Sequence, residues 1–185
     1  MPLQLNGKML AGFDQPIEML CDCHRRVEYF LDVQLRIAER YQHLVLDQEA
    51  RAALENARAY FLDSAPKHTA DEEDSLFPRL LSSSSVTKEC QQALRRLEDD
   101  HLQANRMHFT IDAILAGWLG SDDILPKDVG EHLVEQLRKL RDHYREHIRI
   151  EEEEEVFPYA GQTLPDNQLL EVGKEMRARR RLDQV

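Results

Sequence analysis

Two short segments of the sequence each carry a histidine followed four residues later by a glutamate. The first pair is His68 with Glu72 and the second is His147 with Glu151, and a Phe-Pro dipeptide follows each pair. Residues four apart lie one above the other on a helix, so each segment would present an imidazole and a carboxylate on the same face. This is how a single helix offers two ligands to a metal ion.

A second pair of histidines extends this repeat upstream. His24 lies 44 residues before His68, and His101 lies 46 residues before His147. The chain therefore reads as two halves, in each of which a helix with one histidine precedes a helix with a His/Glu pair. Since an internal repeat constrains the architecture, we expect a four-helix bundle with approximate two-fold symmetry and one central site.

The helices that must position these residues are predicted from apolar residues spaced three and four apart. Four long helices and a short fifth one are expected, at about 14–41, 47–78, 94–118, 126–158 and 165–180. Short connections between them favour antiparallel neighbours. The predicted fold class is all-α, an up-down-up-down antiparallel four-helix bundle with a short C-terminal fifth helix.

The domain organisation follows from these helices. We expect an N-terminal arm at 1–13, the bundle at 14–160, and a short helix and tail at 161–185. Pro66 falls inside the second helix, where a proline removes a backbone hydrogen bond and clashes with the preceding turn. A kink or break is therefore predicted just before His68.

The composition excludes several classes of partner. The formal net charge of −11 argues against nucleic-acid binding, which needs a basic face, but an acidic protein attracts metal cations. No apolar run approaches the ~18 residues that span a bilayer, so we expect no membrane segment. The three cysteines and the absence of a signal-peptide pattern indicate a reducing, cytoplasmic location.

Buried carboxylates on the helix stripes are the strongest indication of a metal. A buried carboxylate without a partner is very costly, so a glutamate at a core position must be paired, protonated or bound to a cation. A single core histidine is more often an ordinary hydrogen-bonded residue than a ligand. Matching placement in both half-repeats favours ligands, and the six candidates are His24, His68, Glu72, His101, His147 and Glu151.

Counting donor atoms favours two ions over one. If Glu72 and Glu151 each bridge two ions and the four histidines are shared equally, each ion receives two oxygens and two nitrogens. An oxo or hydroxo bridge would add a fifth ligand and leave a sixth position open. Mixed histidine and carboxylate donors with an open position suit iron, whereas zinc prefers four ligands. We expect two iron ions, with zinc or another divalent metal as a possible substitute.

With these residues the sequence resembles the hemerythrin-like (HHE cation-binding) domain proteins of bacterial type, over roughly 12–180. The resemblance is carried by the six candidate ligands and by the Phe-Pro that follows each His/Glu pair. It implies a non-haem di-iron centre in an up-down-up-down bundle. It also implies the handling of O2, NO, redox stress or iron, without a single agreed reaction.

Two features depart from the oxygen-carrying hemerythrins, which have a fifth histidine one turn after the ligand of the third helix and an aspartate in place of the last glutamate. Asn105 stands one turn after His101, so that fifth histidine is missing. In addition, the second repeat contains one extra residue before its Phe-Pro. If the fourth helix contains a bulge, Glu152 could replace Glu151 as the ligand.

Three other residues near the predicted site have alternative interpretations. His108 lies seven residues after His101, about 10 Å along a helix, which favours a core or supporting role over direct ligation. His143 lies one turn before His147 and is either a fifth ligand or a supporting residue. Tyr144 either lines the pocket or only packs.

The leading functional hypothesis is a di-iron protein that binds or senses O2 or NO, or that handles iron or redox stress. The alternative is a di-iron enzyme or repair factor that reduces peroxide or NO, or donates iron to damaged iron–sulfur clusters. A bundle that holds only adventitious zinc is a third possibility. The sequence shows no obvious catalytic base, so enzymatic activity is left undecided.

Overall fold

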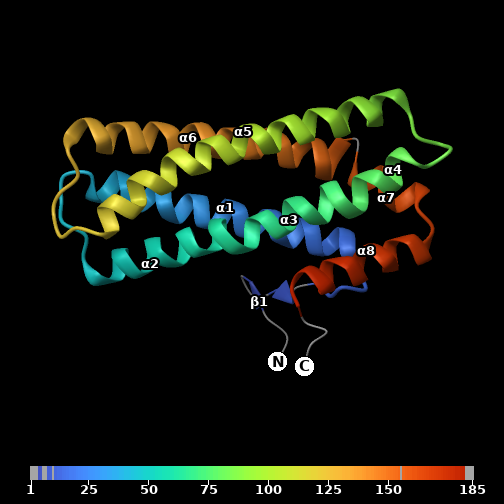
Figure 1. The fold of residues 1–185 in the computed structure, drawn as a ribbon, viewed down its shortest axis with the longest axis horizontal. Helices are drawn as coiled ribbons and strands as arrows, with labels where there is room; N and C mark the ends of the chain where they lie inside the picture. Colours follow the sequence, from blue (N-terminus) through green and yellow to red (C-terminus); the bar gives the residue numbers. More distant parts are fainter. Residues whose placement is uncertain (1–3, 6–7, 10, 155, 182–185) are drawn as a thin grey trace. The chain divides into compact units, whose positions relative to one another are not determined.

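The computed structural model describes residues 4–5, 8–9, 11–154 and 156–181, and they form an all-α helical bundle, as predicted (Figure 1). The strands described are two-residue segments, β1 (Gln4–Leu5) and β2 (Lys8–Met9), which pair antiparallel. The α-helices are α1 (Pro16–Tyr41), α2 (Gln48–Ala59), α3 (Ala65–Asp71), α4 (Phe77–Leu81), α5 (Lys88–Leu119), α6 (Lys127–Arg149), α7 (Phe157–Thr163) and α8 (Asp166–Arg179).

Several helices begin at residues that are favourable at a helix N-terminus. Pro16 is the first residue of α1, where a missing N–H is not needed by the helix. The Asp47 carboxylate accepts a hydrogen bond of 2.8 Å from the Ala50 amide and so caps α2. The Thr87 hydroxyl accepts one of 3.0 Å from the Cys90 amide at the start of α5. These caps satisfy amides that have no partner within the helix.

Three π-helical segments interrupt the helices: η1 (Tyr60–Ser64), η2 (Glu72–Leu76) and η3 (Ile150–Glu154). In η1 the Ala65 amide bonds to the Tyr60 carbonyl, five residues back, and Pro66 follows directly. This irregularity lies where the sequence predicted a kink before His68. A wider turn displaces the carbonyl that the proline ring would otherwise meet, so the helix continues past the proline.

Two predicted helix ends were wrong for the same reason. The second long helix does not stop at Phe77-Pro78, because the chain continues as α4 to Leu81. In η2 the Phe77 amide bonds to the Glu72 carbonyl, and the proline then occupies the first turn of a new helix, where its missing N–H costs little. Likewise α7 begins at Phe157 and includes Pro158, and the sequence did not predict this helix.

By their contacts the residues form two compact units. Unit 2 comprises 26–65 and 99–147, so it contains the later part of α1, α2 with η1, the later part of α5, and nearly all of α6. Its core is built from the apolar stripes of these four helical segments around Trp118, which is 2% exposed. Each fully buried leucine there contributes about 1.5–3 kcal/mol of hydrophobic stabilisation.

Unit 1 comprises 1–25, 66–98 and 148–185, and it has a core of its own that includes Leu76, Phe77 and Leu94. The C-terminal helix α8 is tied to this unit by charge. Asp71 is fully buried and receives hydrogen bonds from Arg179 and Arg180, of 2.9 and 2.7 Å. Two guanidinium groups thus compensate the buried carboxylate.

Within the described residues, no helix combines the length and apolar character needed to cross a bilayer. The predicted domain limits at 13/14 and 160/161 are not tested by these observations and stay predictions.

Candidate metal centre

The six candidate ligands all lie on helices and all are buried. His24 is on α1, His68 on α3, His101 on α5 and His147 on α6, while the two glutamates lie in π-helical segments, Glu72 in η2 and Glu151 in η3. None is more than 5% exposed, and both glutamates are fully buried. Side chains that normally face water are therefore enclosed at all six positions.

Within unit 1, the imidazoles of His24 and His68 each lie close to a glutamate carboxylate. His24 Nε2 lies 3.0 Å from a Glu151 carboxylate oxygen and 3.6 Å from one of Glu72. His68 Nε2 lies 3.4 Å from the same Glu72 oxygen, which is the spacing expected from an i,i+4 pair. One atom from each of His24, His68 and Glu72 forms a group that could hold a metal ion, with all three atoms within 4.8 Å of one another.

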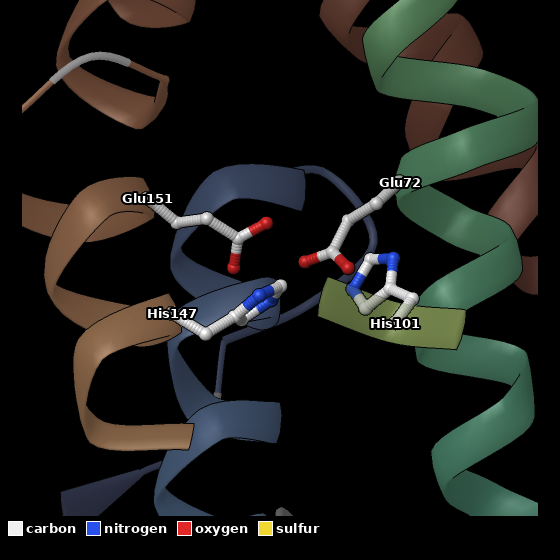
Figure 2. A group of neighbouring side chains, drawn as sticks. All are labelled: Glu72, His101, His147 and Glu151. Atoms are coloured by element: carbon white, nitrogen blue, oxygen red, sulfur yellow. The ribbon is translucent and has the colours of Figure 1, made fainter. Parts of the chain in front are cut away.

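His101 and His147 are neighbours in unit 2, with ring centroids 4.6 Å apart. A second group that could hold a metal ion combines these two histidines with Glu72 and Glu151, again with the ligand atoms within 4.8 Å of one another. Figure 2 shows both carboxylates turned toward the space that the two imidazoles face. Glu72 belongs to both groups, so one carboxylate has imidazoles of both groups within reach.

The charges of this donor set fit a cation. Burial lowers the pKa of His24, but hydrogen bonds to Glu151, Glu152 and Glu72 outweigh it and raise that pKa well above its ordinary value. In the protein alone, a proton on His24 therefore offsets part of the buried negative charge. A divalent cation among the same oxygens and nitrogens would offset more of it and would leave the imidazole neutral and able to ligate.

Glu151 and Glu152, between which the sequence left the choice open, lie in different places. Glu151 is fully buried and belongs to the second group, whereas Glu152 is 26% exposed on its side chain and accepts a 2.8 Å hydrogen bond from His24 Nδ1. Burial raises the pKa of Glu152, but the hydrogen bond to His24 and the nearby positive charges outweigh burial, so the pKa lies below its ordinary value. Glu152 thus orients a candidate ligand, and the assignment of Glu151 as ligand stays a prediction.

Asp100 contacts two histidines of α6, and sequence reasoning did not identify it. His147 Nδ1 lies 3.8 Å from a carboxylate oxygen of Asp100, the residue directly before His101. His143 Nε2 donates a 2.9 Å hydrogen bond to the Asp100 carbonyl, and the metal-ligand groups found among the described residues do not include His143. These contacts favour a supporting role for His143.

The Phe-Pro dipeptides contribute to the site through the aromatic ring. The Phe157 ring stacks on the His24 imidazole, with centroids 5.6 Å apart and an interplanar angle of 3°. Phe77, the matching residue of the first repeat, is fully buried in the core of unit 1. Phe157 therefore covers one face of His24 with an apolar ring, which strengthens electrostatic interactions there.

His108 and Tyr144, which the sequence left without a fixed role, both lie in unit 2, and the Tyr144 ring lies edge-on to the candidate ligand His147, with centroids 6.2 Å apart. His108 Nε2 is 3.0 Å from the Tyr144 hydroxyl, and neither residue is in a metal-ligand group. Burial lowers the pKa of His108 to about 4, so this imidazole is neutral near pH 7. Asn105 lies one turn beyond His101 on α5 and is exposed.

The chain is similar to a known family and to one bacterial protein. The family model described as "Hemerythrin HHE cation binding domain" matches residues 15–160. An uncharacterized protein of Haemophilus influenzae is 30% identical over 179 residues, which cover 96% of this chain and 97% of that protein. The matched range contains all six candidate ligands.

Proposed function

Since the chain belongs to the hemerythrin HHE cation-binding family, we propose that its buried His/Glu groups hold two iron ions and bind or sense O2 or NO, or act in iron or redox stress. The observation that carries this proposal is the sharing of Glu72 between two groups of candidate ligands. A carboxylate within reach of imidazoles in both groups suits a bridge between two ions.

The donor atoms divide evenly in this proposal. His24 and His68 would serve one ion, His101 and His147 the other, and the two carboxylates would bridge. Support comes from Glu151, which lies 3.0 Å from His24 Nε2 and also belongs to the group with His101 and His147. Mixed imidazole and carboxylate donors of this kind suit iron.

The side chains themselves would orient and enclose the metal. Glu152 accepts a hydrogen bond from the proton at His24 Nδ1, so that Nε2 would be the nitrogen that gives up its proton and ligates when a metal binds. The burial of all six candidates keeps bulk water away from them. Bound iron would supply the redox chemistry and a coordination position for a small diatomic ligand.

The alternative, a di-iron enzyme or an iron donor to damaged clusters, stays open. An iron donor that passes metal through a thiolate would need a cysteine that ionises readily. Burial and the neighbouring Glu152 raise the pKa of Cys21 to about 11, so its thiol stays protonated near pH 7. This favours ligand binding, or reduction of peroxide or NO, over transfer through Cys21.

Metal analysis combined with anaerobic spectroscopy tests the proposal. The protein is purified without added metal, its metal content is measured, and absorption spectra of the reduced protein are recorded before and after O2 or NO is added. We expect two irons per chain and a spectrum that changes with the gas. Zinc alone, or no metal, would contradict the proposal, and rapid turnover of peroxide or NO would favour the enzyme.

A further inference from the structure

A cavity of about 210 Å3 lies in unit 2, apart from the candidate ligands. Its walls come from α1, α2, η1 and α5. Leu62 and Phe109 on its wall are exposed, at 57% and 79%, whereas Ile111 and Leu115 are buried. The cavity therefore extends from the protein surface into the core of unit 2.

The size and the lining of the cavity suit one aromatic ring. Phe61 and His108 both line it, and their rings lie together with centroids 4.5 Å apart, so part of the wall is an aromatic surface. Aromatic ligands pack well against such surfaces in offset or edge-on arrangements. An apolar cavity of about 150 Å3 is enough to hold benzene in another protein, so 210 Å3 accommodates one substituted ring.

A buried polar side chain in the cavity wall indicates which substituent the aromatic ring of the ligand should carry. Gln34 lines the cavity, is 2% exposed, and has no hydrogen-bond partner for its side-chain oxygen Oε1. Buried acceptors without a donor are uncommon, because losing water without replacement is costly. A hydroxyl group on the ligand could donate to this oxygen.

The charges around the cavity favour a neutral ligand. Arg58 and Asp112, the charged side chains of its wall, pair with each other at 2.6 Å. His108 is uncharged near pH 7, because burial lowers its pKa to about 4. A charged ligand would lose hydration without gaining an opposite charge.

We propose that this cavity binds a small neutral aromatic alcohol of the phenol class, whose ring packs against Phe61 and His108 and whose hydroxyl donates to Gln34. The site is distinct from the metal centre and does not depend on which metal that centre holds. The cavity and the metal centre are nonetheless linked through α5, because Asn105 of the cavity wall lies one helical turn beyond His101. A ligand in the cavity would therefore contact the same helix that carries a candidate metal ligand.

Fluorine NMR of three probes tests the site on the full-length protein. 4-Fluorophenol carries the ring and the hydroxyl, 4-fluorotoluene only the ring, and 4-fluorobenzoate a charge. We expect 4-fluorophenol to bind at one site per chain, 4-fluorotoluene about tenfold more weakly because it cannot donate to Gln34, and 4-fluorobenzoate not measurably. Equal binding of the first two, binding of the benzoate, or no binding by any probe would overturn the proposal.

Two variants locate the binding. Gln34→Leu keeps the side-chain volume but removes the acceptor, so the affinity for 4-fluorophenol should fall to that for 4-fluorotoluene. Gln103→Leu makes the same change at an exposed position of α5 outside the cavity wall and should leave the tenfold preference intact. If Gln34→Leu fails to fold, Leu62→Trp at the exposed edge should block all binding, and unchanged affinity there would refute the site.

Discussion

Two consecutive glutamates in η3 show how much one position matters at the candidate centre. Glu151 is fully buried and faces imidazoles, whereas Glu152 accepts a hydrogen bond from the far side of the His24 ring. A carboxylate in that place determines which ring nitrogen carries the proton. It would therefore act on a bound metal through His24 without contacting the metal itself.

Removing this outer contact should weaken metal binding while all six candidate ligands remain. For Glu152→Ala we expect an affinity about 10- to 100-fold lower, measured by competition with a chelator. Glu153→Ala removes the same charge from the adjacent exposed residue and should have little effect. Equal affinities in the two variants would show that the His24–Glu152 bond does not support the site.

His108 should make stability depend on pH. Its folded-state pKa is lowered to about 4, mainly because the ring is buried. The nearby Asp112 carboxylate raises this pKa and His143 lowers it, but both effects are smaller than that of burial. In the unfolded chain the ordinary value is about 6.5, so below this pH the unfolded state binds a proton that the folded state does not. The contribution of His108 to stability therefore falls as the pH drops from about 6.5 to 4, by up to about 3 kcal/mol.

Urea unfolding of metal-free protein at pH 7 and pH 4 measures this effect. His108→Leu lacks the titrating group, so the free energy of unfolding of the wild type should fall more than that of the variant over this interval. A difference between the two proteins that does not change with pH would contradict the burial argument.

At the scale of the elements, the π-helical segments place the glutamates. Glu72 opens η2 and Glu151 lies in η3, so both carboxylate candidates sit where the helix widens. Segments of this kind are often found at functional sites, because the extra residue in the turn redirects the side chains that follow.

Close packing of α8 against the N-terminal segment gives a test at this scale. A methyl group on Gly173 would lie 1.8 Å from the Phe13 carbonyl oxygen, so Gly173→Ala should force the two segments apart and destabilise the protein by about 1–3 kcal/mol. The same change at Gly161 in α7 meets nothing within 4 Å and should stabilise by about 0.5–1 kcal/mol. Thermal unfolding compares the two, and equal effects would contradict the contact.

At the scale of the whole molecule, the candidate ligands come from four stretches that are distant in the sequence. They lie at 24, 68–72, 101 and 147–151, and only folding collects them into the two groups. A metal that needs these groups binds the folded chain in preference to the unfolded one. Metal binding should therefore add to the stability of the fold.

Loss of metal should accordingly lower the melting temperature. With free metal at 1,000 times its dissociation constant the stabilisation is about 4 kcal/mol, equivalent to roughly 10 °C for a chain of this size. His68→Ala or a strong chelator should remove most of it, whereas His132→Ala, at an exposed position of α6, should not. A His68→Ala variant with unchanged iron content and melting would contradict the proposed centre.

The sequence alone was enough to predict the all-α fold and the residues worth testing as ligands. Apolar residues at helical spacing are a local signal, so α1 was predicted nearly to both ends and α5 nearly to its C-terminal end. The repeated His/Glu pairs are local as well, because four residues on a helix always share a face. These properties do not depend on what the helices pack against.

Only the tertiary structure decided what surrounds each candidate. Which of Glu151 and Glu152 faces the other candidate ligands depends on where the π-helical turn forms. The position of that turn depends on how the helix packs against the rest of the protein. His143 bonds to a carbonyl 43 residues away, and the cavity beside Gln34 is closed by residues of α5 more than 70 positions later. Such contacts join segments that are remote in the chain, and no periodicity within one helix encodes them.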